Sequence, residues 1–178
     1  MDSYERVMAA LNLYERSKDK TDDLRDAIMH EIAQGDGAMF DHLPDNELDT
    51  PLTKAVLLGL HDAVKAMLEK GANPNHVDGW GYTPLIITVG ISSAPIEIMK
   101  ALLDGGADPN AAGRFVHTPI HHAVVKRPVS FVKMLMEAKA NPNLSVNGVY
   151  PSAMDELNGL IVHDQDRFRA ILALMEKN

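Results

Sequence analysis

The residues best suited to chemistry in this 178-residue chain are histidines. His117, His121 and His122 lie close together at an expected helix start, and His76 and Asp78 form a smaller group upstream. Imidazole and carboxylate groups bind zinc and act as general bases, so a zinc or catalytic site is one interpretation. The alternative is that these histidines are structural. The elements that would position them decide between the two interpretations.

Other chemical motifs are absent from the sequence. The chain has no cysteine, which excludes disulfides, thiolate catalysis and cysteine-based zinc sites. It has no glycine-rich phosphate loop, no nucleophile elbow and no paired carboxylates beyond acids at helix starts. We therefore predict no catalytic residue, no metal site and no cofactor.

The net charge of −8 is distributed unevenly along the chain. Residues 1–49 contain 13 Asp and Glu against 5 Lys and Arg, whereas the remaining residues are balanced at 12 of each. Binding to nucleic acid through phosphate neutralisation is therefore not expected. The acidic run from Asp19 to Asp26 either docks on a basic partner or forms a solvated helix start, and the second is the more common case.

A group of basic residues lies in the second half of the chain. It either contacts an acidic ligand or is ordinary surface charge, and the sequence does not separate the two. The group consists of Arg114, Lys126, Arg127, Lys133 and Lys139.

No targeting or membrane segment is expected. The first residues, Met1 to Arg6, are polar and do not resemble a signal peptide. No run of about 18 apolar residues is present, so no helix is expected to span a membrane. We expect a soluble monomer that is cytoplasmic, or is delivered without a cleaved signal peptide.

Two short motifs recur along the chain with a common period. The first motif is found in Lys70–Asn75, Gly105–Asn110 and Ala138–Asn143, at spacings of 35 and 33 residues. The second begins at Thr50, Thr83, Thr118 and, in a degraded form, Ser152, at spacings of 33, 35 and 34 residues. Such a period is typical of repeat architectures.

Each motif has a physical interpretation. Thr followed by Pro places a hydroxyl at the N-cap of a helix and a ring at its first position, where no amide hydrogen is needed. Gly59 permits a tight reversal, and Gly71 suits the left-handed residue that ends the second helix. Each unit is therefore predicted to be turn, helix, reversal and helix. Lys139 replaces the terminating glycine of the third unit, at a cost of about 1 kcal/mol if it is left-handed.

These motifs closely resemble the ankyrin-repeat pattern, Gly-x-Thr-Pro-Leu-His followed by Gly-Ala-Asp-x-Asn. The resemblance covers residues 49–150 well and extends weakly to the C-terminus. It implies an all-α ankyrin-repeat solenoid, in which stacked helix–turn–helix pairs carry β-hairpin fingers and helical caps close both ends. It also implies that His121 is the family's structural histidine and that His117 lies at the end of a finger.

The resemblance and the composition predict the domain organisation. Residues 1–48 form an acidic helical cap, since Tyr4, Val7, Leu11 and later apolar residues recur at helical spacing. Three repeats follow, at about 49–81, 82–116 and 117–150. Residues 151–178 form a C-terminal capping pair of helices. Caps are needed because the terminal faces of an array would otherwise expose its core.

The resemblance implies that the chain binds another protein, as an adaptor or inhibitor, through its finger tips and inner helices. Large rings and Arg at such positions dominate interface energetics. Trp80 and Phe115 alternatively pack finger against finger. Mapped onto this sequence, the predicted partner-binding residues are Leu57, Leu58, Val77, Trp80, Tyr82, Arg114, Phe115, His117, Val125 and Lys126.

Two alternative functions stay open. One is a small effector or neutralising protein that blocks a toxin or host factor by covering its surface. The other is an enzyme whose catalytic residues lie in residues 1–48. This second alternative is weaker, because so short a segment hardly buries an active site and contains only His30 and His42 as bases near neutral pH.

Overall fold

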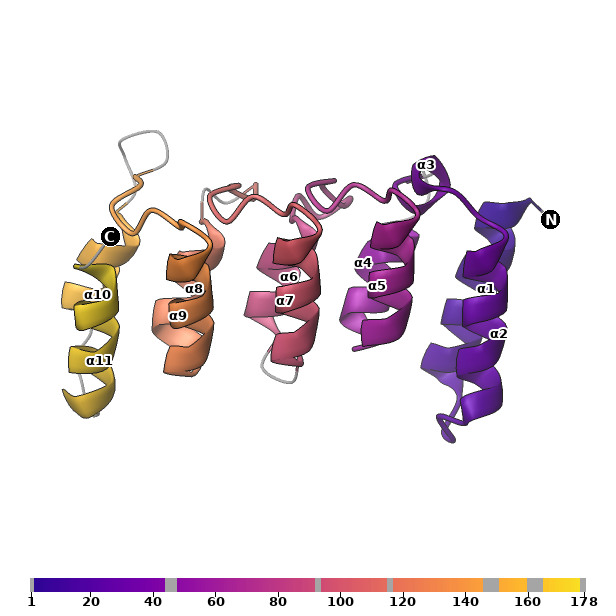
Figure 1. The fold of residues 1–178 in the computed structure, drawn as a ribbon, viewed down its shortest axis with the longest axis horizontal. Helices are drawn as coiled ribbons and strands as arrows, with labels where there is room; N and C mark the ends of the chain where they lie inside the picture. The colour runs from indigo at the N-terminus through magenta and orange to yellow at the C-terminus, as the bar shows by residue number, and fades with distance from the viewer. Residues whose placement is uncertain are drawn as a thin grey trace.

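A computed structural model describes residues 2–43, 48–91, 94–114, 117–145, 151–159 and 165–176. This part of the chain contains eleven helices and no strand (Figure 1). The helices are α1 (Ser3–Arg16), α2 (Asp22–Ala33), α3 (Gly37–Phe40), α4 (Pro51–Leu57), α5 (His61–Glu69), α6 (Pro84–Gly90), α7 (Ile96–Asp104), α8 (Pro119–Lys126), α9 (Val129–Glu137), α10 (Ala153–Gly159) and α11 (Gln165–Met175).

The helices form a row of antiparallel pairs, with the two chain ends at opposite ends of the row (Figure 1). One layer contains α1, α4, α6, α8 and α10, each in contact with the next. The other layer contains α2, α5, α7, α9 and α11. We call these the inner and outer layers. The prediction of an all-helical solenoid is confirmed.

Local chemistry explains where the inner helices begin. The hydroxyls of Thr50 and Thr83 accept hydrogen bonds from backbone N–H groups three residues later, at 3.1 and 3.3 Å. A proline follows each threonine at the first helical position. Ser152 and Asp155 form a reciprocal cap at the start of α10, so the degraded fourth motif still begins a helix.

The reversals use the backbone conformations that the sequence predicts. Gly59, Gly71 and Gly106 have φ angles of 72°, 92° and 91°. Lys139 has a φ of 68° and is the one non-glycine residue with positive φ in the described part of the chain. It occupies the position of Gly71 and Gly106 and adopts the left-handed conformation that these glycines adopt.

The core runs without interruption through both layers. The N-terminal helices belong to it, because α1 contacts α4 and α2 contacts α5. The largest side chains that are fully buried are Phe40, Leu11, Ile28, Ile32, Leu52, Met67, Leu85, Ile98, Met99, Leu102, Ile120 and Leu135. Residues of α1, α2 and α3 thus contribute as fully to the core as those of the repeats.

A ladder of side-chain hydrogen bonds joins the loops of successive pairs. The side chain of Asn75 accepts from the Asp108 N–H at 2.7 Å, and that of Asn110 accepts from the Asn141 N–H at 2.7 Å. Asp41 takes the same role at the N-terminal end, where its carboxylate accepts from the Asn73 N–H at 2.9 Å. The ladder therefore begins in the acidic N-terminal segment.

In the described part, each connection expected as a hairpin finger has one hydrogen bond from a backbone N–H of its first arm to a backbone carbonyl of its second arm. The Asp78 N–H donates to the Tyr82 carbonyl at 3.0 Å, and the Gly113 N–H donates to that of His117 at 3.2 Å. Neighbouring fingers are then joined by one bond each. These connections are short and rich in turn residues, which leaves no room for a strand ladder.

Candidate functional site

The finger between α5 and α6 is held in shape by Asp78. Its buried carboxylate accepts hydrogen bonds from the N–H groups of Trp80 and Tyr82, at 3.0 and 2.8 Å. Burial raises the pKa of the Asp78 carboxyl, and these backbone donors act in the opposite direction. The finger is therefore a rigid turn that presents the side chain of Trp80 at its tip.

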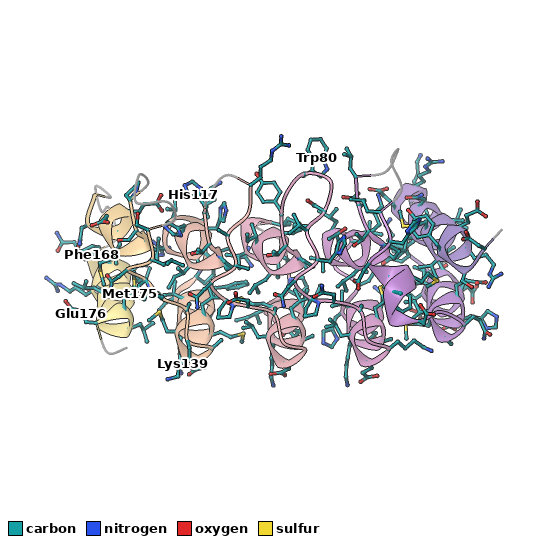
Figure 2. All side chains as sticks on the ribbon, turned by 90° about the horizontal axis from the view of Figure 1, so that it is seen from above. Trp80, His117, Lys139, Phe168, Met175 and Glu176 are labelled. Carbon is teal, nitrogen blue, oxygen red and sulfur yellow. The ribbon has the colours of Figure 1, made fainter. Side chains whose placement is uncertain are left out.

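Trp80 projects from the molecule beyond the inner layer, whereas Lys139 lies on the side of the outer layer (Figure 2). Trp80 is 55% exposed. The next residue, Gly81, accepts a 2.7 Å hydrogen bond from the Arg114 N–H of the following finger. A Cβ at Gly81 would approach the Cβ of Arg114 to 2.4 Å, so only glycine permits this contact. The backbones of the two neighbouring fingers that carry the exposed Trp80 and the exposed Arg114 are thus held together.

Apolar side chains are also exposed at one equivalent position of the inner helices. Counting from the Thr-Pro starts, Leu57 of α4, Gly90 of α6 and Val125 of α8 are equivalent positions. Leu57 and Val125 are exposed. A Cβ placed on Gly90 would meet nothing within 4 Å. Gly90 therefore leaves open space on the inner layer between two exposed apolar side chains.

The ten residues predicted from the sequence differ in their exposure. Leu57, Val77, Trp80, Arg114, Val125 and Lys126 are exposed. Leu58, Tyr82 and His117 are half-buried, and the first two pack against the core. Phe115 lies outside the described residues. The exposed members come from the finger side and from inner helices, where a partner can reach them.

The group of basic residues separates into different environments. Arg127 is buried, and its guanidinium donates to the carbonyls of Ile91 and Ala94, at 2.7 and 2.9 Å. Lys133 lies on outer helix α9, with its Nζ 3.8 Å from a carboxylate oxygen of Glu137. The interpretation of Arg127 as surface charge or ligand contact was therefore wrong, because the carbonyls that it satisfies come from the preceding repeat.

The histidine cluster is built into the packing of α8 against α10. The Nδ1 of His121 accepts from the Thr118 N–H at 3.1 Å, and its Nε2 lies 3.2 Å from the Pro151 carbonyl. The ring of His117 stacks on that of His121 and lies edge-on to that of His122, at 5.5 and 5.7 Å between centroids. These contacts are what a structural histidine makes.

Burial shifts the titration of two of these histidines. It lowers the pKa of His121 below its ordinary value and that of His122 to about 4. Electrostatic interaction with His117 and with Lys126 lowers the pKa of His122 further. No group of three or more His, Cys, Asp or Glu residues within the described ranges is arranged to hold a metal ion.

Sequence reasoning missed two features of the inner side. Leu48 is an exposed apolar residue whose carbonyl accepts a 2.8 Å hydrogen bond from the Gly79 N–H, next to Trp80. Its place two residues before the Thr50 motif, equivalent to Gly81, was the signal for a finger position. Lys54 is almost buried in α4, with its Nζ 2.6 Å from a carboxylate oxygen of Glu15. Nothing in the local sequence predicts that pair.

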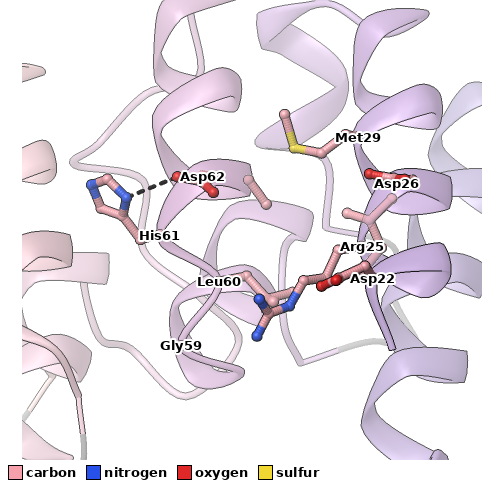
Figure 3. A pocket seen from close by; sticks show the side chains of 10 residues that line it. Asp22, Arg25, Asp26, Met29, Gly59, Leu60, His61 and Asp62 are labelled. Atoms are coloured by element: carbon pink, nitrogen blue, oxygen red, sulfur yellow. Dashed lines mark hydrogen bonds and ion pairs between the residues drawn. The ribbon is translucent and has the colours of Figure 1, made fainter. Parts of the chain in front are cut away.

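A cavity of about 410 Å³ lies between outer helices α2 and α5 (Figure 3). Asp22, Arg25 and Asp26 line one wall, and His61 and Asp62 line the other. The imidazole of His61 lies 3.1 Å from the Asp62 carboxylate, and both side chains are well exposed to solvent. The cavity is therefore a gap between neighbouring helix pairs whose lining mixes these charged residues with apolar ones, including Ile28 and Leu60.

The enzyme alternative required bases in residues 1–48. His30 and His42 are both exposed, and neither lines the cavity. The ring of His42 lies edge-on to that of Tyr4, with 4.9 Å between centroids.

Within the described ranges, no helix combines the length and the apolar character needed to cross a membrane.

Comparison with known proteins places this architecture. A family model described as ankyrin repeats (3 copies) matches residues 11–112 and, in an overlapping match, residues 52–146. No curated protein matches the chain. Ankyrin repeats generally mediate protein–protein interaction and are typically non-catalytic modules. Since the two matches together span well over half of the sequence, the chain belongs to the ankyrin-repeat family.

Proposed function

We propose that the chain is an adaptor or inhibitor that binds a partner protein through its finger tips and inner helices. The observation that carries the proposal is the exposure of Trp80, the sole tryptophan, at the tip of a rigid finger on the side of the inner layer. An exposed aromatic ring whose backbone is already ordered loses little entropy when a partner covers it. It is therefore a suitable interface anchor.

The proposed surface extends from this finger to the inner helices. Leu48 and Val77 lie on the same pair of fingers as Trp80, and Leu57 and Val125 lie on α4 and α8. All five are exposed although they are large and apolar. Exposed apolar side chains gathered on one side of a molecule are typical of protein-binding surfaces. Phe115 is included because it lies three residues before Thr118 in the sequence, as Trp80 lies three residues before Thr83.

The proposal assigns residues 49–150 to three repeats and both flanking segments to capping. At the N-terminal end, α1 and α2 cover α4 and α5. At the C-terminal end, the Arg167 guanidinium of α11 donates to the Val124 and Arg127 carbonyls, at 2.9 and 2.8 Å. These bonds satisfy carbonyls near the end of α8 that the helix itself leaves free. The flanking segments thus satisfy polar groups as well as covering apolar ones.

The test measures the affinity of a partner protein for the wild-type chain and for the variant Trp80→Ala. The partner is the protein that co-purifies with the wild-type chain in a one-to-one complex. We expect Trp80→Ala to weaken binding tenfold or more, which is about 1.4 kcal/mol or greater. The melting temperature should barely change, because the ring is largely exposed. Leu13→Ala is the matched control, since Leu13 is 58% exposed but lies on α1, away from the fingers. Unchanged affinity with a lower melting temperature would show that Trp80 is structural.

A further inference from the structure

Two cations stand out on the proposed surface because nothing in the described structure pairs with them. Arg114 is exposed on the finger after Trp80, and Lys126 is exposed in the last turn of α8. No described carboxylate lies within ion-pair distance of either. By contrast, Lys54, Lys65 and Lys133 each have a carboxylate oxygen within 4 Å.

These cations are placed among the apolar side chains of the surface. The backbone N–H of Arg114 donates a hydrogen bond to the carbonyl of Gly81, the residue directly after Trp80. Lys126 directly follows Val125, and its charge reaches the inner-layer ring of His122. Gly90, which leaves open space above α6, is the position of α6 that is equivalent to Leu57 of α4 and Val125 of α8, the inner helices on either side. The surface therefore alternates apolar contacts with unpaired positive charge.

The charge of the rest of the chain is opposite. The net charge of residues 1–49 is −8, and that of the remaining residues is zero. An approaching acidic segment is repelled at the N-terminal end and attracted at the third repeat. A basic segment experiences the reverse. Electrostatic complementarity of this kind chiefly sets the orientation and the association rate of a complex.

We propose that the occupant of this surface is an acidic segment of a partner protein that carries apolar side chains. Its carboxylates pair with Arg114 and Lys126. One apolar side chain covers the ring of Trp80, and another fills the open space over Gly90 between Leu57 and Val125. This proposal rests on the proposed function and specifies the chemistry of the partner.

The test begins with a displayed library of random short peptides, which is selected against the 178-residue chain. We expect the selected peptides to be enriched in Asp and Glu together with aliphatic or aromatic residues. This outcome is discriminating, because the net charge of −8 by itself favours basic peptides. Enrichment in Lys and Arg, no enrichment in charge, or no selected peptide at all would overturn the proposal.

The selected peptide that binds most tightly is then titrated against the chain, with the emission of Trp80 as the readout. Because Trp80 is the sole tryptophan, its emission needs no label. Arg114→Glu and Lys126→Glu should each weaken binding about tenfold, and added salt should weaken the wild-type complex. Lys133→Glu is the matched control, since it makes the same charge change on outer helix α9. An equal effect of all three variants would show that only net charge matters and would contradict the proposal.

A further variant tests the apolar part. Gly90→Leu fills the open space without a backbone clash, because Gly90 lies in α6 and a Cβ there meets nothing within 4 Å. It should weaken binding of the selected peptide about tenfold while the helix content stays the same. Failure of the charge inference and failure of the surface are distinguishable. Basic peptides that change Trp80 emission would refute the charge inference alone. Peptides whose binding is unaffected by Trp80→Ala, measured with a labelled peptide, would refute both.

Discussion

The side chain of Arg127 donates a 2.7 Å hydrogen bond to the carbonyl of Ile91, 36 residues earlier in the chain. This bond joins the reversal between α8 and α9 to the end of α6. The guanidinium also donates to the Ala94 carbonyl and lies 3.8 Å from the centroid of the Phe131 ring. Burial lowers the pKa of Arg127 from its ordinary value. The residue therefore acts as a buried connector between two repeats.

The first prediction concerns this connector. Arg127→Met keeps much of the apolar stem but removes both donors, which leaves the Ile91 and Ala94 carbonyls without their partner. We expect the free energy of unfolding to fall by about 2–3 kcal/mol, because unpaired buried acceptors are costly. Urea denaturation followed by circular dichroism measures the change. Lys126→Met, which removes an exposed charge from the neighbouring residue, should leave stability nearly unchanged. Equal effects of the two variants would contradict the role of Arg127.

The second prediction concerns the strained lysine. Lys139 has a φ of 68°, a conformation that glycine adopts in the equivalent positions Gly71 and Gly106. Lys139→Gly should raise the free energy of unfolding by up to about 1 kcal/mol, because glycine relieves the left-handed strain. The reverse substitution, Gly106→Ala, should destabilise by a similar amount although its Cβ meets no atom within 4 Å. Thermal unfolding of both variants measures the effects. A destabilised Lys139→Gly protein would refute the strain argument.

The third prediction concerns the acidic N-terminal segment. Leu11 is fully buried in α1, whereas Leu13 on the same helix is 58% exposed. Leu11→Ala should lower the free energy of unfolding by about 2–5 kcal/mol, as buried Leu to Ala changes do, and Leu13→Ala should change it little. Denaturation curves compare the two variants. Similar stabilities would mean that α1 does not pack in solution, and residues 1–48 would then be a tail instead of a cap.

The fourth prediction concerns pH. The pKa of His122 is lowered to about 4 in the folded protein, against an ordinary value of 6.5. Between pH 4 and pH 6.5 the unfolded state therefore binds more protons at His122 than the folded state does. Above about pH 6.5 this imidazole is neutral in both states and does not affect stability. As the pH falls from 6.5 toward 4, the free energy of unfolding decreases. The ring is only partly buried, so we expect a loss of about 1–2 kcal/mol over this range. The groups near this ring are His117, His121 and Lys126.

The matched variant for this prediction is His122→Ile. Ile87 occupies the equivalent position of α6, so the substitution suits the helix layer. The variant should lose less stability between pH 7 and pH 4 than the wild-type chain. Melting temperatures measured across this range give the difference, in which the titration of all other groups largely cancels. Parallel pH profiles would show that His122 does not titrate as described.

Most of the architecture could be predicted from the sequence because its determinants are local. Thr-Pro at a helix start and glycine at a helix end act on their own backbone, within a few residues. The left-handed conformation of Lys139 agrees with its alignment with Gly71 and Gly106. The exposure of Trp80 and Val125 also agrees with the finger and inner-helix positions to which the repeat pattern assigned them.

The sequence by itself thus determined the period, the helix pairs and the register of the candidate surface. Only the tertiary structure decided which charges are buried and which stay free. Arg127 and Arg114 belong to the same basic group in the sequence, yet one is enclosed by carbonyls of the preceding repeat and the other is exposed. Lys54 likewise pairs with Glu15, 39 residues away. The physical reason is that desolvation and pairing of a charge depend on groups that packing brings from other repeats, whereas capping and periodicity depend on chain neighbours.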